Sequence, residues 1–111
     1  MTRQFIELNF FMKCWSALGL DDDDLFDLER RLLTNPNAGA VMPGCNGARK
    51  VRVAIPGQGK SSSVRVIYVD FIVKERIYLL FAYPKNKQET LTEEQKQYIR
   101  IMIKAIKSED L

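Results

Sequence analysis

The sequence predicts an α+β fold: an N-terminal strand, two helices, a meander of three antiparallel strands and a C-terminal helix. Before residue 36 and after residue 91, apolar residues recur at the spacing typical of helices. Between them, residues 48–83 contain three stretches rich in β-branched and aromatic residues. The chain has 111 residues, enough for one hydrophobic core, so a single domain over residues 1–111 is expected.

The N-terminal third is expected to form a short strand over residues 3–8 and two helices. The first helix follows the strand and ends at Gly19. Its apolar residues at helical spacing are Phe10, Phe11, Cys14, Trp15 and Leu18. The second helix starts in the aspartate run and is stopped by Asn35-Pro36. Its leucines repeat at three and four residues: Leu25, Leu28 and Leu32.

The aspartate run, Asp21–Asp24, allows two interpretations. Carboxylates are ligands of hard cations, but the spacing of a calcium-binding loop is absent. Negative charge at the start of a helix satisfies free N–H groups and interacts favourably with the helix dipole. Capping of the second helix is therefore the better interpretation.

The middle of the chain predicts a sheet. Residues 37–47 are rich in Gly, Pro and Asn, which indicates a loop. Residues 48–55 alternate with the period of a strand. Residues 64–73 and 76–83 are nearly continuous apolar runs joined by a tight turn. They are expected to be central strands of a three- or four-stranded antiparallel sheet.

The C-terminal helix has a clear start signal, because Thr92 and Gln95 have the spacing of a capping box. Its apolar residues form one stripe: Ile99, Met102, Ile103 and Ile106. This stripe is expected to pack against the sheet or against a partner.

The composition favours a cytoplasmic protein without a membrane partner. The longest apolar runs are far below the roughly 18–20 residues that span a bilayer, and the N-terminus lacks the pattern of a signal peptide. Cys14 and Cys45 match neither a metal-binding spacing nor a disulfide framework. Two reduced thiols are the expected state.

The net charge of +3 is unevenly distributed. Residues 1–43 have a net charge of −3, residues 44–87 have +7 and residues 88–111 have −1. A basic segment between acidic ones is typical of a localised phosphate-binding surface. A solvated polar face is the alternative.

The segment "PGQGKSSS" resembles the end of a nucleotide-binding P-loop, through Gly59-Lys60-Ser61. The first glycine of such a loop would fall at position 54, which is alanine, and a strand follows instead of a helix. Nucleotide binding is therefore rejected. A cationic hairpin loop is the remaining interpretation.

An antiparallel meander brings the end of its first strand, the start of its second and the end of its third to one edge of the sheet. Five cations and a tyrosine are expected at this edge: Lys50, Arg52, Lys60, Arg65, Lys85 and Tyr83. Lys50 and Arg52 point to the same face, because side chains alternate along a strand.

Such a cluster can bind or cleave RNA. The chain has no histidine, which excludes histidine-based ribonuclease chemistry, Ser-His triads and histidine metal ligands. No acidic pair lies among the basic residues, so two-metal nuclease chemistry is not expected. The 2′-OH of RNA can attack the adjacent phosphate while Lys and Arg stabilise the phosphorane charge. Without histidine, such an enzyme should depend on something else to orient the RNA.

Four stretches of the sequence resemble the HigB/RelE toxins of bacterial type II toxin–antitoxin systems, specifically the HigB branch. They are "LLTNPNAGAVMPGCNGARKVRVA", "GQGKSSSVRVIYV", "RIYLLFAYPKN" and "ETLTEEQK". The resemblance extends over about residues 3–107. The sequence departs from the family pattern in three places. Leu91 stands where RelE has a catalytic tyrosine, Ser62-Ser63 replace the usual Gly-Gly, and Pro84 interrupts Tyr-x-Lys.

The resemblance implies a compact RelE-like fold and a ribosome-dependent endonuclease that cleaves mRNA in the ribosomal A site, with no metal or other cofactor. It implies RNA-cleaving roles for Lys50, Arg52, Arg65 and Lys85, and RNA-binding roles for Lys60 and Tyr83. It also implies a cognate antitoxin, expected to be a helix-turn-helix protein, which neutralises the toxin. Operator DNA is expected to be bound only through that antitoxin.

Two other functions are left open. A ParE-like toxin of the same superfamily would poison DNA gyrase by binding, although such proteins usually lack the cationic cluster. A catalytically inactive RNA-binding protein would bind RNA in a salt-sensitive way without cutting it.

Overall fold

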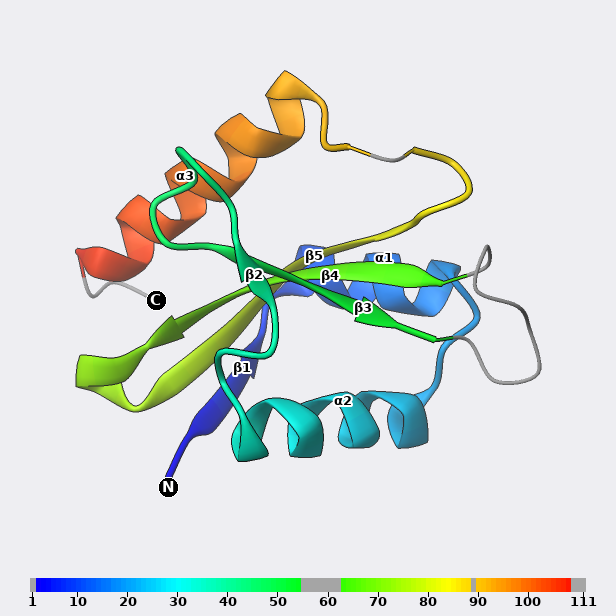
Figure 1. Ribbon diagram of the computed structural model, residues 1–111, viewed down its shortest axis with the longest axis horizontal. Helices are drawn as coiled ribbons and strands as arrows, with labels where there is room; N and C mark the ends of the chain where they lie inside the picture. The colour runs from blue at the N-terminus through cyan, green and yellow to red at the C-terminus, as the bar shows by residue number, and fades with distance from the viewer. Residues whose placement is uncertain (1, 55–62, 89, 109–111) are drawn as a thin grey trace.

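The computed structural model describes residues 2–54, 63–88 and 90–108. A sheet with the strand order β1-β5-β4-β3-β2 forms the centre, with α3 on one side and α2 on the other (Figure 1). The strands are β1 (Gln4–Glu7), β2 (Ala40–Val41), β3 (Arg49–Val53), β4 (Val64–Phe71) and β5 (Arg76–Pro84). The helices are α1 (Asn9–Ala17), α2 (Asp22–Thr34) and α3 (Glu93–Lys107), and a short 3-10 helix, η2 (Ile72–Lys74), joins β4 to β5.

The predicted fold class and the order of its main elements are confirmed, but the predicted antiparallel sheet of three or four strands is wrong. β3, β4 and β5 form the expected meander. β1 pairs in parallel with the first half of β5. The sequence of so short a strand does not show whether it pairs in parallel or antiparallel. β2 lies in the expected loop and pairs with β3 through Ala40 and Val41. Two residues are too few to give a strand period, so β2 could not be predicted from the pattern.

Helices α2 and α3 start as predicted. At α2, the Asp24 N–H donates to Asp21 Oδ1 at 2.9 Å and the Asp21 N–H donates to Asp24 Oδ2 at 3.0 Å. At α3, the Gln95 N–H donates to Thr92 Oγ1 at 3.1 Å and the Thr92 N–H donates to Gln95 Oε1 at 2.9 Å. The capping interpretation of the aspartate run is therefore confirmed. In the part of the chain that the structure describes, no group of three or more His, Cys, Asp or Glu side chains is placed to hold a metal ion.

The sheet has a hydrophobic core on each side. Helices α1 and α2 pack on one side, where the buried residues include Phe11, Trp15, Leu28, Leu32, Val51 and Val66. Helix α3 packs on the other side, through Ile99, Ile103 and Ile106. The apolar stripe of α3 thus lies against the sheet, one of its two predicted partners. None of the described helices is long and apolar enough to cross a membrane.

Helix α1 divides its aromatic residues between the two sides. Phe11 and Trp15 are buried, whereas Phe10 is 43% exposed and stacks on Phe81 of β5. The helical spacing of these residues did not predict this difference between Phe10 and Phe11. Helix α1 lies beside β5, so successive side chains of the helix can reach opposite sides of the sheet.

Candidate functional site

Strand register brings three of the predicted site residues into one row across the sheet. Arg52 of β3 lies opposite Arg65 of β4, and Arg65 lies opposite Tyr83 of β5. Residues directly opposite one another point to the same face and have Cβ atoms about 4.5–5.5 Å apart. These three residues are called the arginine row below.

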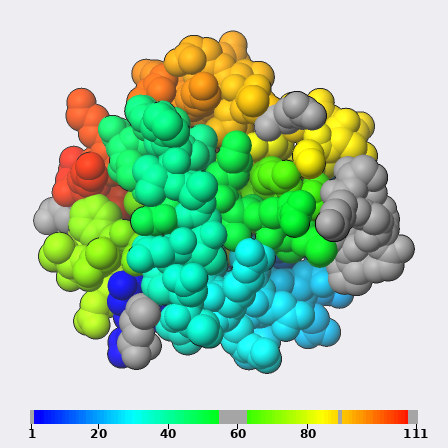
Figure 2. Space-filling view, in the orientation of Figure 1, coloured from blue at the N-terminus to red at the C-terminus, as the bar shows by residue number. Residues whose placement is uncertain are grey.

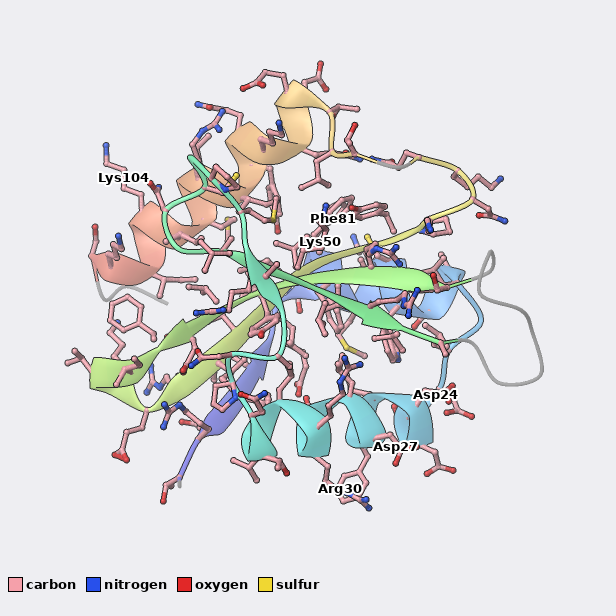
Figure 3. All side chains as sticks on the ribbon, viewed as in Figure 1. Asp24, Asp27, Arg30, Lys50, Phe81 and Lys104 are labelled. Carbon is pink, nitrogen blue, oxygen red and sulfur yellow. The ribbon has the colours of Figure 1, made fainter. Side chains whose placement is uncertain are left out.

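A second row lies two residues further along the same face. It consists of Lys50, Ile67 and Phe81. Ile67, Phe81 and Tyr83 belong to the core beneath α3, which fixes the side of the sheet that carries the cations. Figure 3 shows Lys50 and Phe81 between the sheet and α3, whereas Asp24, Asp27 and Arg30 lie on α2. In the space-filling view, the strands are exposed between α2 and α3 (Figure 2).

Ser63 connects the arginine row to Lys85. Its hydroxyl accepts a hydrogen bond from Arg65 Nη1 at 2.9 Å, and its carbonyl oxygen accepts one from the Lys85 N–H at 2.9 Å. Ser63 is 1% exposed, the one buried polar residue among those described. It therefore orients one predicted catalytic side chain and positions the backbone of another. Sequence reasoning gave it no role, and its only signal was the departure from the family's Gly-Gly.

Among the described residues, the cations of this site have no acidic partner. Over residues 2–54, 63–88 and 90–108, the ion pairs are Arg3 with Asp70 at 2.7 Å and Arg100 with Glu93 at 2.9 Å. Both lie outside the arginine row. Two like charges directly opposite one another in a sheet destabilise it. Arg52 and Arg65 therefore form an uncompensated positive site that would gain from binding an anion.

The backbone around Arg52 is anchored to α2. Its carbonyl oxygen accepts a hydrogen bond from Arg31 Nη1 at 2.7 Å, and its own side chain is exposed. Lys50 is half-buried. Lys60, predicted to bind RNA, lies outside the described residues.

Tyr83 is more enclosed than its predicted role suggests. It is 2% exposed, its ring stacks on Phe81 with centroids 5.7 Å apart, and its buried hydroxyl has no hydrogen-bond partner among the described residues. Burial raises the pKa of the phenol, and the charge of Arg65 offsets part of that increase. The phenol therefore keeps its proton at neutral pH and can donate a hydrogen bond but is a poor base. Leu91, which the sequence resemblance matches to the family tyrosine, packs in the same core.

The arrangement suits the recognition of a phosphodiester. Guanidinium groups bind phosphate oxygens with two parallel hydrogen bonds, and Lys adds a compact charge. Arg52 and Arg65 are neighbours, and Ser63 ties the Lys85 backbone to the same sheet end. Four of the six predicted site residues are thus brought to one end of the sheet, with Lys50 one row away on the same face.

Residues 11–110 match the family described as "RelE toxin of RelE / RelB toxin-antitoxin system". The chain belongs to the RelE toxin family. As a member, it is the toxin of a toxin–antitoxin pair, which implies a cognate antitoxin.

The RelE fold is also found in a solved structure. The free-state structure of a double arginine mutant of the E. coli toxin RelE is similar to this chain, with a TM-score of 0.56. The two chains are 17% identical, and the similarity covers 80% of this chain and 90% of the E. coli protein. At this identity the likeness concerns the fold alone, and it confirms the RelE-like α+β architecture.

Proposed function

We propose that this RelE-family toxin is a ribosome-dependent endoribonuclease that cleaves mRNA in the ribosomal A site and so inhibits translation. The observation that carries this proposal is the arginine row, in which Arg52 and Arg65 lie side by side without a carboxylate partner in the described chain. We further propose, from the sequence motifs, that the protein is a single cytoplasmic toxin domain of the HigB branch. Its antitoxin is a helix-turn-helix protein that alone contacts operator DNA.

The proposed reaction uses the RNA's own nucleophile. The 2′-oxygen forms a bond to the adjacent phosphorus, and the bond from phosphorus to the 5′-oxygen breaks. The products are a 2′,3′-cyclic phosphate and a 5′-hydroxyl. One proton leaves the 2′-hydroxyl and one reaches the 5′-oxygen. Arg52 and Arg65 stabilise the charge that develops on the non-bridging oxygens, while Lys50 and Lys85 are the candidate groups for proton transfer.

Dependence on the ribosome follows from the poor acid–base groups of the chain. There is no histidine, and the buried Tyr83 phenol is held in its protonated form. Fixed geometry can replace much of the missing acid–base catalysis, because alignment of reacting groups alone lowers a barrier by several kcal/mol. The ribosome would supply that alignment by holding the mRNA in the A site.

The test is primer extension on translating ribosomes supplied with a defined mRNA and the purified chain. Cleavage is expected within the A-site codon, with none on the same mRNA free in solution. Arg65→Ala should lower the cleavage rate by roughly 30- to 1,000-fold, the effect of losing one charge-stabilising donor. Arg30→Ala is the matched control, since Arg30 lies on the outer side of α2 (Figure 3).

Failure to cut mRNA on active ribosomes would refute the proposal. In that case, inhibition of gyrase supercoiling would support the ParE-like alternative. Salt-sensitive RNA binding without a cut product would instead indicate an inactive RNA-binding protein.

A further inference from the structure

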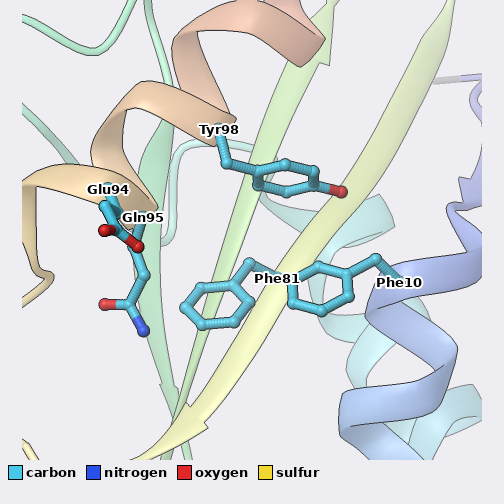
Figure 4. Close-up of a pocket in the computed structure, with 5 residues that line it drawn as sticks. All are labelled: Phe10, Phe81, Glu94, Gln95 and Tyr98. Carbon is cyan, nitrogen blue, oxygen red and sulfur yellow. The ribbon is translucent and has the colours of Figure 1, made fainter.

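An apolar hollow opens beside the arginine row, between α1, β5 and α3 (Figure 4). Its volume is about 390 Å³, within the range of small-molecule sites. Three aromatic side chains and two polar ones line it: Phe10, Phe81, Tyr98, Glu94 and Gln95. Neither the predicted site nor the proposed cleavage reaction uses this hollow.

The aromatic rings are arranged as a platform. Phe10 and Phe81 are parallel to within 3°, with centroids 5.4 Å apart, and Tyr98 meets Phe10 edge-on at 5.1 Å. Phe81 is 6% exposed and forms the floor, whereas Phe10 is 43% exposed and offers an open ring. A single exposed apolar side chain is common on protein surfaces, but exposed apolar side chains that line a groove together indicate a binding site.

This platform is continuous with the arginine row. Phe81 stacks on Tyr83 with centroids 5.7 Å apart, and Tyr83 lies opposite Arg65. Phe81, which lines the hollow, is therefore two residues along β5 from Tyr83, the residue that pairs with Arg65. In a nucleotide, a base lies next to its phosphate in the same way.

The charge of the rim favours a base over a phosphate at this place. Glu94 lines the hollow with a carboxylate, which repels phosphate and can accept hydrogen bonds only. Amino groups on base edges are suitable donors to such a carboxylate. The Gln95 side chain is held in place, because its Oε1 accepts hydrogen bonds from the Thr92 N–H at 2.9 Å and from the Gln88 amide at 2.8 Å.

We propose that this hollow binds an RNA base next to the scissile phosphate, by stacking on Phe10 and Phe81. The inference rests on the proposed endonuclease function, since it assigns the base to the RNA whose phosphate lies on the arginine row. Stacking of bases on aromatic side chains is a general mode of single-stranded RNA recognition. The hollow thus orients the nucleotide whose phosphate is attacked.

The test uses short 2′-O-methyl RNAs that cannot be cleaved, each with one 2-aminopurine, whose fluorescence is quenched on stacking. The wild-type chain should quench the probe at one position. Phe10→Ala should weaken that binding by roughly 5- to 150-fold. Phe10→Leu keeps an apolar side chain but removes the ring, and should also abolish quenching. Phe26→Ala is the matched control, because Phe26 is 59% exposed on α2, away from the hollow.

Ribosomal cleavage by the wild-type chain is measured in parallel, so that the two proposals can fail separately. Cleavage without quenching at any position would overturn the base site and leave the endonuclease proposal intact. Quenching that depends on Phe10 but comes without cleavage would support the base site and refute the endonuclease. If Phe10→Leu still quenches the probe but is no longer neutralised by the antitoxin, the hollow binds the antitoxin instead of a base. That result would overturn the proposal.

Discussion

Removal of the Ser63 hydroxyl is the sharpest test of how the site is held together. In Ser63→Ala, the Arg65 guanidinium loses the acceptor that holds it at 2.9 Å. The bond from the Lys85 N–H to the Ser63 carbonyl oxygen remains, because it involves only backbone atoms. The substitution therefore frees the Arg65 side chain while leaving the strand ends paired.

The size of the effect follows from the type of bond and its surroundings. A hydrogen bond to a charged group contributes about 1.5–3 kcal/mol. Arg65 is only half-buried, so in the variant a hydrogen bond to water replaces part of the lost interaction. About 1–2 kcal/mol of transition-state stabilisation should therefore be lost. The cleavage rate should then fall by roughly 5- to 30-fold. The free energy of unfolding should fall by about 1 kcal/mol or less, since the substitution removes a single oxygen atom and water can solvate the freed Arg65 guanidinium.

The assay is single-turnover cleavage of mRNA on programmed ribosomes, with urea unfolding as the stability measurement. Ser63→Thr keeps a hydroxyl and should retain most of the activity. Ser16→Ala, at an exposed serine of α1, is the control for loss of a hydroxyl.

A double-mutant cycle separates positioning from general destabilisation. In the Arg65→Ala background, Ser63→Ala should have no further effect on the rate. The same fold-loss in both backgrounds would refute the positioning role, and so would an unchanged rate in the single variant.

Three further changes test the fold around the site. Burial, followed by the hydrogen bond and the charge of Glu7, raises the pKa of Glu29 to about 8 from 4.5. The stability that protonated Glu29 contributes is complete below about pH 4.5 and is lost as pH rises through about 8. After solvent screening, the free energy of unfolding should fall by on the order of 1–2 kcal/mol over this range. Glu29→Gln should remove this decline in urea unfolding, and an identical pH slope would contradict the assignment. Thr92→Ala should cost about 1 kcal/mol of stability through the lost cap of α3, and a loss near zero in thermal unfolding would contradict the capping role. Gly39→Ala places a Cβ 2.8 Å from the Lys50 carbonyl oxygen. The backbone must shift there, which should lower the free energy of unfolding by about 1–3 kcal/mol. Unchanged urea unfolding would show that β3 can move away without strain.

Features encoded within a few residues could be predicted from the sequence. Both capping boxes depend on side chains three positions apart, so their partners stand together in the sequence. The α3 stripe is likewise local, and Ile99, Ile103 and Ile106 are all fully buried. The meander was also predictable, because hairpin-linked strands pair with their sequence neighbours.

Features that depend on partners far apart in the chain were missed. The parallel pairing of β1 with β5 joins residues more than 70 positions apart, such as Gln4 and Arg76. Ser63 was given no role, because its bond to the Lys85 N–H is known only once β4 and β5 are paired, although Arg65 is near it in the sequence. Phe10 and Phe11 are chemically identical neighbours, and only the position of α1 beside β5 separates the exposed ring from the buried one.

The far side of the sheet determines where the arginine row lies. Between the cation rows, Val51, Val66 and Ala82 form a row that points to the opposite face and packs beneath α1 and α2. A slip of one residue between strands would turn every side chain of the slipped strand to the other face. It would bury Arg52 or Arg65 among apolar residues, at a cost of several kcal/mol for an unpaired charge. The repulsion between the two arginines is far smaller, because both side chains reach solvent. The apolar face therefore fixes the register, and that register keeps the like charges side by side in the absence of RNA.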